Sequence, residues 1–368
     1  MTKSNLQNPP ENVAEYTSNR LIDKLLTALK YGTLLKHGRR KIALLVSYLF
    51  ARVCGVSLKV DLSTILDKPV DVVDVGASDG PSKIWEQFAD KLRLTLVEPE
   101  PESYKIIQDR FKDDIRIRCL QAALSSMNGP RNLYVVKWPR ASSVHPVRED
   151  FRQQIFLRDH FETKQIIPIE CERLDLHCTN IDFIKTDVEG HDLHVIKGTG
   201  NLMNNCIGAQ LEVNFNDLWR EGQMTFSDID QYMRSFGFII TEIRSPGYWH
   251  FLLPSPHLES KGFIAASDFL YFRFPSDIVQ QIKSGAWPKD KLAKALALYL
   301  AYGNYEFTFV LLQLATKEKL LSITDILYIK TMNLIERRSG YNKLITYKWI
   351  KRLQEFISGE KHTNNLGY

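Results

Sequence analysis

Seven short runs of β-branched and aromatic residues, separated by helix-length stretches, constrain the fold of this chain more than any other feature. They lie between residues 70 and 274 and read VDVVDVGA, LRLTLVE, IRIRCLQAAL, IDFIKTDVE, IGAQLEVNF, FGFIITEI and DFLYFRF. Because each run is apolar almost throughout, rather than at alternate positions, both of its faces should be buried. The pattern predicts an α/β fold with a Rossmann-like, doubly wound and mostly parallel seven-stranded sheet.

Helical regions flank these runs on both sides. The first 66 residues hold two apolar stretches with helical spacing, and almost everything from Pro288 to Ile357 has helical periodicity, with turns at Gly303 and Gly340. We expect the C-terminal helices to cover part of the α/β core or to form an oligomer interface. The predicted parts are a helical N-terminal extension (1–66), the α/β domain (67–275) and an all-helical C-terminal region (276–368).

Charge is distributed unevenly along the chain. Residues 1–52 carry nine Lys or Arg against three Asp or Glu, and residues 283–368 carry fourteen against seven. Since the whole chain has a net charge of +5, the region between them has a net charge of −8. This balance, without a pattern of basic and aromatic residues, argues against nucleic acid as a partner. The basic ends are either solvated faces or a site of peripheral contact with an anionic membrane.

Cysteine usage and hydropathy bear on the compartment. The five cysteines are scattered, without the Cys-x-x-Cys spacing of a structural zinc site. The first twenty residues lack the apolar run of a secretory signal, and the longest apolar run, Ile42 to Phe50, is far shorter than the roughly 20 residues of a membrane-spanning helix. We therefore expect a cytoplasmic protein that is at most peripheral to the inner face of a membrane.

The clearest sign of a ligand site follows the first strand. The loop Gly76-Ala77-Ser78-Asp79-Gly80 precedes a helix predicted to begin near Pro81, and its glycines let the backbone approach a ligand closely. The second strand ends at Glu98, where an acidic residue can accept hydrogen bonds from the hydroxyls of a ribose. Carboxylates around the loop repel a pyrophosphate but favour the ammonium and sulfonium groups of S-adenosylmethionine. The predicted cofactor is therefore S-adenosylmethionine, bound by Asp74, Gly76, Ala77, Ser78, Gly80 and Glu98.

Three blocks of the sequence resemble one family, the FkbM-type S-adenosylmethionine-dependent methyltransferases. They are DVVDVGASDG at 71–80, LVEPEPESY at 96–104 and DFIKTDVEGHDLHVIKG at 182–198, the last resembling the family's strand-four signature. The resemblance covers about 70–275 and implies the class I methyltransferase fold. It also implies that Asp187 lies close to the cofactor and Glu189 closer to the acceptor. The family usually has a small or apolar residue, followed by Glu, where this chain has His191 and Asp192.

Methyl transfer to a hydroxyl requires a group that removes the proton as the new bond forms. Carboxylates at the carboxyl ends of neighbouring strands lie where such sheets place substrates, so we expect Glu189, Glu212 and the nearby His191 to be catalytic. An alternative role for Glu212 is that of a ligand to a sugar hydroxyl. Ser142 and Ser143, in a polar loop between two further predicted strands, NLYVVKW and KQIIPIE, are candidates for substrate binding.

The predicted function is O-methylation of a hydroxyl, that of a sugar in a glycan or glycolipid. The end of the fourth strand lacks the Asn/Asp-Pro-Pro-Tyr pattern that amine acceptors usually require. Two alternatives stay open. Asp187, Glu189, His191 and Glu212 offer ligands for Mg²⁺ or Mn²⁺, although a metal is not favoured. A non-catalytic scaffold with a retained fold is the other, but it would have no need of an intact cofactor loop.

Overall fold

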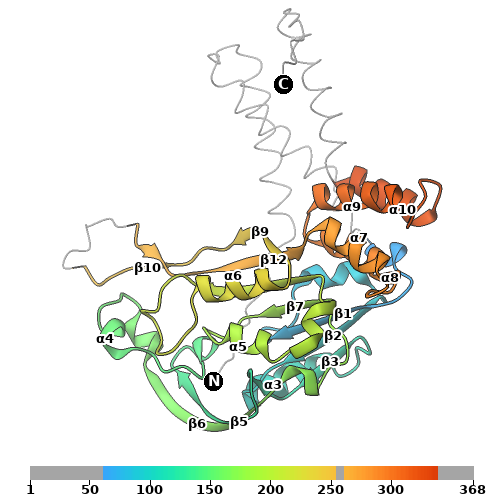
Figure 1. Ribbon diagram of the computed structural model, residues 1–368. Helices are drawn as coiled ribbons and strands as arrows, with labels where there is room; N and C mark the ends of the chain where they lie inside the picture. Colours follow the sequence, from blue (N-terminus) through green and yellow to red (C-terminus); the bar gives the residue numbers. More distant parts are fainter. Residues whose placement is uncertain (1–60, 254–260, 339–368) are drawn as a thin grey trace, which may run out of the picture. The chain divides into compact units, whose positions relative to one another are not determined.

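The computed structural model describes residues 61–253 and 261–338. Its centre is the predicted seven-stranded sheet (Figure 1). The first five strands in spatial order are parallel neighbours, whereas β12 runs antiparallel to both β8 and β9. The sequence-based prediction of a mostly parallel sheet is therefore confirmed. The order is β3 (Ile117–Leu120), β2 (Leu92–Val97), β1 (Val70–Val75), β7 (Phe183–Thr186), β8 (Gly208–Asn214), β12 (Ala266–Arg273) and β9 (Phe238–Arg244).

The connections between these strands hold helices and two small sheets. One small sheet joins β4 (Ala123–Leu124), β6 (Thr163–Glu172) and β5 (Gly129–Val136), and the other pairs β10 (Tyr248–Trp249) with β11 (Phe263–Ile264). The α-helices are α3 (Pro101–Phe111), α4 (Glu149–Arg152), α5 (Asp192–Lys197), α6 (Phe226–Ser235), α7 (Pro275–Lys283), α8 (Asp290–Ala301), α9 (Tyr305–Lys317) and α10 (Ile326–Arg338). The 3-10 helices are η1 (Leu62–Ile65), η2 (Lys83–Phe88), η3 (Pro139–Ala141), η4 (Arg158–Phe161), η5 (Leu174–Leu176) and η6 (Gly200–Asn205).

Each face of the large sheet has its own apolar core, because successive residues of a strand point to opposite faces. Phe183 of β7 and Phe272 of β12 lie in a core to which α7, α8 and α9 contribute. Their neighbours Ile184 and Tyr271 lie in a second core that is shared with α5 and α6 (Figure 1). Burial on both faces explains why the strands are apolar throughout.

The predicted pair of strands in the polar segment is also confirmed. β5 and β6 are antiparallel, with Leu133 opposite Ile167. Together with β4 they occupy the long connection between β3 and β7, and they lie beside the end of the large sheet at which β1 and β2 finish. The structure thus places a second wall next to the carboxyl ends of the parallel strands.

The helix predicted near Pro81 has a different form. In its place is η2, a 3-10 helix of six residues from Lys83 to Phe88. Three residues per turn bring Trp85 and Phe88 onto one side, where both are buried in the core of the α8 face. The glycine loop is therefore not followed by the α-helix N-terminus that the sequence predicts.

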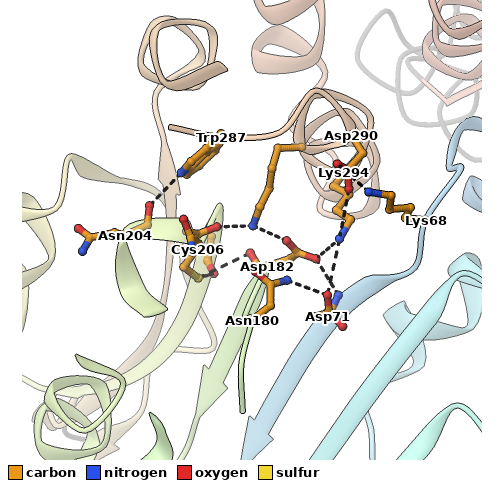
Figure 2. Close-up of polar contacts among 12 residues, drawn as sticks. Lys68, Asp71, Asn180, Asp182, Asn204, Cys206, Trp287, Asp290 and Lys294 are labelled. Carbon is orange, nitrogen blue, oxygen red and sulfur yellow. Dashed lines mark hydrogen bonds and ion pairs between the residues drawn. The ribbon is translucent and has the colours of Figure 1, made fainter. Parts of the chain in front are cut away.

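A buried group of charges fastens α8 to the sheet (Figure 2). Asp182, directly before β7, is fully buried, and its Oδ1 and Oδ2 accept hydrogen bonds from Lys291 at 2.5 Å and Lys294 at 2.7 Å. The backbone N–H of Asp71 donates to the same carboxylate at 2.8 Å. Burial alone would raise the pKa of Asp182, but the two ammonium groups outweigh it and hold the pKa below its usual value.

The described part of the C-terminal region is helical from α7 to α10, and the predicted turn at Gly303 joins α8 to α9. Since α8 lies within the core of one sheet face, the expectation that these helices cover the α/β core agrees with the packing. The boundaries of the three predicted parts stay predictions. The N-terminal helices, the second turn at Gly340 and the basic residues of 1–52 and 339–368 lie outside the described residues.

Candidate functional site

The loop after β1 is shaped by two glycines with left-handed backbone angles. Gly76 has a φ of +80° and Gly80 a φ of +82°, and the N–H of Gly76 donates to the carbonyl of Val97 at 3.0 Å. A Cβ atom on Gly76 would lie 2.0 Å from the backbone oxygen of Asp187. Only glycine therefore allows this loop to approach the end of β7 so closely.

Glu98 follows β2 at the same edge of the sheet. It is 6% exposed, and its Oε1 accepts a hydrogen bond from the backbone N–H of Glu100 at 3.0 Å. Burial raises the pKa of Glu98 to about 7, with the hydrogen bond from Glu100 acting in the opposite direction. This carboxyl is thus held in the position and environment in which a ribose hydroxyl can donate to it.

A cavity of about 500 Å³ lies between this edge and the β5–β6 pair. The carboxyl-terminal edge of a parallel sheet, where the loops diverge, is where α/β folds bind ligands. Residues of the large-sheet side include Gly76, Ser78, Asp79, Glu98, Asp187 and His191. Residues of the opposite side include Leu133, Trp138, Arg140, Ser142, Ser143, Gln165 and Ile167.

The structure brings most of the predicted site residues to this cavity, but not all of them. Those that line it are Gly76, Ser78, Glu98, Asp187, Ser142, Ser143 and His191. Those outside its lining, among the residues that the structure describes, are Asp74, Ala77, Gly80, Glu189 and Glu212.

Packing explains why part of the predicted cofactor set lies elsewhere. Asp74 is an internal residue of β1, is 1% exposed, and forms an ion pair with Lys185 at 3.3 Å. Ala77 is 2% exposed and belongs to the core of the α8 face. Gly80 packs against Phe111, whose ring would lie 3.1 Å from an added Cβ atom. Asp74, Ala77 and Gly80 thus shape the loop from outside the cavity instead of facing a ligand.

The turn after β7 is strained at the residue expected to be catalytic. Glu189 has a φ of +54°, and the following Gly190 has a φ of +94°. A left-handed angle is costly for a residue with a side chain and persists only where the surroundings hold it. Here the hydroxyl of Ser143 donates to the backbone oxygen of Glu189 at 2.9 Å, so the turn is tied to the wall of the cavity.

Beside the turn, two glutamates share one buried arginine. The guanidinium of Arg220 is fully buried and lies 3.6 Å from the Oε2 of Glu189. Glu212 faces Asp268 across β8 and β12, and its Oε2 is buried without a hydrogen-bond partner in the described part of the chain. Burial raises the pKa of Glu189, with the charge of Arg220 opposing the shift. Burial and then the charge of Glu189 raise the pKa of Glu212 well above its ordinary value.

His191 is buried rather than exposed on its helix, with an exposed fraction of 3%. Its Nδ1 lies 2.9 Å from the Nε2 of His145, and its Nε2 lies 3.0 Å from the hydroxyl of Ser125. The residue expected to be catalytic is therefore engaged through both ring nitrogens.

The structure adds site residues that the sequence does not single out. Trp138 and Arg140 line the cavity, and Arg140 reaches across to Asp79 at 2.7 Å. His145 and Arg220 lie buried behind its wall. The first three belong to the long polar segment between β5 and β6, and the length of that segment is the one signal that could have found them. Nothing in the sequence marks Arg220.

Within 61–253 and 261–338, no group of three or more His, Cys, Asp or Glu side chains is arranged to hold a metal ion. Cys119, Cys171, Cys178 and Cys206 are all free thiols. In the same part of the chain, no helix is long and apolar enough to cross a membrane.

S-adenosylmethionine fits the residues that surround the cavity. The volume suits a nucleoside-sized ligand, Glu98 offers the acceptor that a ribose requires, and Gly76 leaves room where any side chain would collide with β7. Asp79 and Asp187 lie on the side of the cavity nearest the glycine loop, and each has a cation beside it, Arg140 at 2.7 Å and Lys185 at 3.6 Å.

Comparisons with known proteins agree with this interpretation. Residues 74–240 match the family model described as the methyltransferase FkbM domain. No curated protein sequence matched the chain.

The solved structures that match show only a distant likeness to this chain. For magnesium protoporphyrin IX methyltransferase from Synechocystis PCC 6803, the identity is 10%, the coverage 73% of this chain and 100% of that one, and the TM-score 0.29. For precorrin-6y C5,15-methyltransferase from Geobacter metallireducens, the identity is 13%, the coverage 58% of this chain and 85% of that one, and the TM-score 0.30. For fibrillarin from Methanococcus jannaschii, the identity is 11%, the coverage 57% of this chain and 68% of that one, and the TM-score 0.30.

The glycine loop, the acidic residue after β2 and the signature after β7 all fall inside the matched region. The scaffold alternative loses ground accordingly, because the match is to an enzyme domain, and Gly76 and Glu98 line the cavity. The chain therefore carries a methyltransferase domain of the FkbM family over residues 74–240, and it is an S-adenosylmethionine-dependent methyltransferase.

Proposed function

We propose that this enzyme methylates a hydroxyl group, that of a sugar in a glycan or glycolipid. The observation that carries the proposal is the pair Glu189 and Glu212, two carboxyls with raised pKa values at the end of the sheet where the cavity lies. A general base works best when its pKa lies near the operating pH, and burial achieves this for a carboxylate.

The two carboxyls differ in their surroundings, which suggests different roles. Arg220 faces Glu189 and favours its ionised form, whereas Glu212 has Glu189 and Asp268 as neighbours and is driven toward its protonated form. We therefore assign proton acceptance to Glu189. A protonated Glu212 would donate a hydrogen bond to an acceptor oxygen, in keeping with its alternative role as a ligand to a sugar hydroxyl.

When bound, S-adenosylmethionine would supply the methyl group on its sulfonium. Glu98 would hold its ribose, and Asp187 would offset its positive charge. The backbone oxygen of Glu189 accepts a hydrogen bond from Ser143, which ties the turn that carries the accepting carboxylate to the wall of the cavity. Holding the acceptor and the donor together in this way removes much of the entropic cost of a bimolecular reaction.

The far wall of the cavity supports a sugar as the acceptor. Ser142, Ser143 and Gln165 offer hydrogen-bonding groups, and Arg140 adds a donor fork. Trp138, which is 45% exposed, presents an apolar ring face against which the C–H groups of a pyranose can pack. A polyhydroxylated ring suits this mixture better than a planar apolar acceptor would.

The proposal also covers the location of the enzyme, which depends on the basic residues at the two ends of the chain. We propose a cytoplasmic enzyme whose basic ends bring it to an anionic membrane surface, near a lipid-linked glycan. Sedimentation with anionic vesicles should show binding that weakens with salt and is lost when residues 1–52 are deleted. A protein that stays in the supernatant at low salt would contradict the proposed membrane contact, but it would not affect the proposal of methyl transfer to a hydroxyl.

Turnover tests the assignment of Glu189. Methyl transfer from S-adenosylmethionine to a panel of sugars and sugar nucleotides should identify an acceptor, and Glu189→Gln should lower kcat by about 10²-fold or more for loss of a general base. Cofactor affinity, measured by calorimetry, should stay the same. The control is Glu170→Gln, which changes an exposed carboxyl on β6 and should leave kcat unaltered. Full turnover by Glu189→Gln that a chelator abolishes would favour a metal-dependent mechanism instead.

A further inference from the structure

Two histidines from distant parts of the chain meet at the cavity, whose lining includes His191. His191 directly precedes α5, after the strained turn, and His145 belongs to the segment that carries Ser142 and Ser143. Both are buried, with exposed fractions of 3% and 8%. The Nε2 of His145 and the Nδ1 of His191 lie 2.9 Å apart, a hydrogen bond of normal length.

The outer ends of the pair fix which nitrogen carries each proton. The Nδ1 of His145 lies 2.9 Å from the backbone oxygen of Glu221, and a carbonyl can only accept, so this nitrogen must carry a proton. Burial lowers the pKa of His145 to about 4 and that of His191 to about 2, so both rings are neutral at physiological pH.

A neutral His145 with a proton on Nδ1 has a bare Nε2. The bond to His191 therefore requires a proton on the Nδ1 of His191, which leaves its Nε2 bare in turn. The hydroxyl of Ser125, 3.0 Å away, must then donate to that nitrogen. The hydrogen bonds thus form one series from Ser125 through both rings to the carbonyl of Glu221, and each group in it donates to the next.

This series of hydrogen bonds leaves neither ring nitrogen of His191 free to take a proton from the hydroxyl that is to be methylated. Its far end is a backbone carbonyl, which cannot pass a proton on. The geometry thus disagrees with the catalytic role that the sequence suggests for His191, and it points to another use for the residue.

The same segment is held to the turn by two further hydrogen bonds. The hydroxyl of Ser143 donates to the backbone oxygen of Glu189 at 2.9 Å and accepts from the N–H of His145 at 3.1 Å. Arg220, which also faces Glu189, donates to the backbone oxygen of His145 at 2.8 Å. The hydrogen bonds of the His145 ring and of its backbone oxygen therefore connect the serine segment with His191, beside the turn of Glu189, and with the loop that carries Arg220.

We propose that His145 and His191 are positioning residues: as a neutral pair they fasten the serine segment, Ser142–His145, to the turn of Glu189, and so set the distance between the acceptor-binding wall and the base. The functional part of this statement rests on the proposed function. The pairing itself does not, because it concerns hydrogen bonds within the chain.

The first test reads the protons directly on the full chain without any substrate. Nitrogen-15 spectra of selectively labelled histidine should show both rings neutral at pH 7, each with its proton on Nδ1. A proton on Nε2 of either ring, or a charged ring, would overturn the proposal. As the pH falls, His194, whose ring stacks on His191 at 4.5 Å, and the cations Arg131 and Arg220 should continue to disfavour a charged pair.

The second test uses variants and hydrogen exchange. His191→Phe keeps a ring but removes both hydrogen bonds, and we expect amide exchange in residues 142–145 to become about tenfold faster or more, since local opening reports the loss of such contacts. His191→Asn keeps a donor near the position of Nδ1 and should restore most of the protection. Unchanged exchange in a folded His191→Phe protein, or no rescue by Asn, would contradict the positioning role.

Kinetics then separates this proposal from the proposed function. With an acceptor in hand, His191→Phe should raise the acceptor KM and lower kcat, His191→Asn should recover both, and the acidic limb of the pH profile should keep its midpoint. A limb that disappears in both variants would make His191 the base and overturn the positioning role. If no acceptor is ever found, the proposed function fails, but the proton positions and the exchange rates still decide the pairing.

Discussion

Cofactor affinity should depend on pH through Glu98, whose carboxyl the structure places 6% exposed at the cavity with a pKa raised to about 7. Ribose hydroxyls donate to the ionised form, so binding requires Glu98 to be deprotonated. The apparent Kd should then scale as one plus the ratio of protonated to ionised Glu98. That factor is about 1.1 at pH 8 and about 11 at pH 6, a tenfold loss of affinity that corresponds to about 1.4 kcal/mol.

Isothermal titration of S-adenosylmethionine in two buffers of different ionisation enthalpy measures both quantities. At pH 6 the protein should release about 0.9 proton per cofactor through Glu98, and at pH 8 about 0.1. Glu98→Gln provides the comparison, because the titration of the ligand's own amino group is the same in both proteins. Glu102→Gln, at another carboxyl of the cavity, is the matched control and should keep the pH dependence. Identical pH dependence in the wild-type protein and Glu98→Gln would refute the reasoning.

The contribution of Glu98 to the free energy of unfolding should fall as the pH rises, whereas cofactor affinity should increase. A carboxyl whose pKa is higher in the folded than in the unfolded state stabilises the fold below its unfolded pKa of 4.5, and that contribution is lost as the pH rises through about 7. Glu98→Gln should therefore raise the free energy of unfolding at pH 8 by up to about 3 kcal/mol relative to its effect at pH 4. Urea denaturation at the two pH values checks the sign.

Three further outcomes follow from the structure. Glu98→Ala should weaken cofactor binding by about 1.5–3 kcal/mol, measured by calorimetry, and an unchanged affinity would remove the ribose assignment. Gly76→Ala should abolish cofactor binding because its Cβ would meet the backbone of β7, whereas Gly285→Ala, which has a similar φ but open space around it, should bind normally. Asp182→Asn should destabilise the fold by about 3–5 kcal/mol in urea, since it removes the buried carboxylate that accepts from both Lys291 and Lys294, and a cost under about 1 kcal/mol would contradict their burial as ions.

The sheet could be predicted because strands that are buried on both faces have apolar residues at most positions, and this pattern is visible in the sequence. Both faces of β1 and β8 are largely buried, and the predicted ends of these runs agree with the structure to within two residues. The position of β12 between β8 and β9 has no such local pattern in the sequence, because strand order depends on the path of the connections between the strands.

The site was predictable where a residue acts through the backbone or stands at the end of a strand. Gly76 and Glu98 belong to this kind, and both line the cavity. The bond between His145 and His191 joins positions 46 residues apart, and Arg220 approaches Glu189 only through the folding of a later loop. Partnerships of this kind depend on tertiary packing, which periodicity and motif spacing do not describe.

The contact between α8 and Asp182 separates the boundary of the sequence family from the boundary of the folding unit. The family match ends at residue 240, yet the aspartate inside it finds its cations only at residues 291 and 294. A fragment that stops at residue 275 would keep every cofactor residue but would expose an apolar sheet face and leave Asp182 without the two lysines that pair with it. Limited proteolysis should accordingly leave α8 with the methyltransferase core, and any relative that shares the sheet but lacks α8 must close that face by some other means.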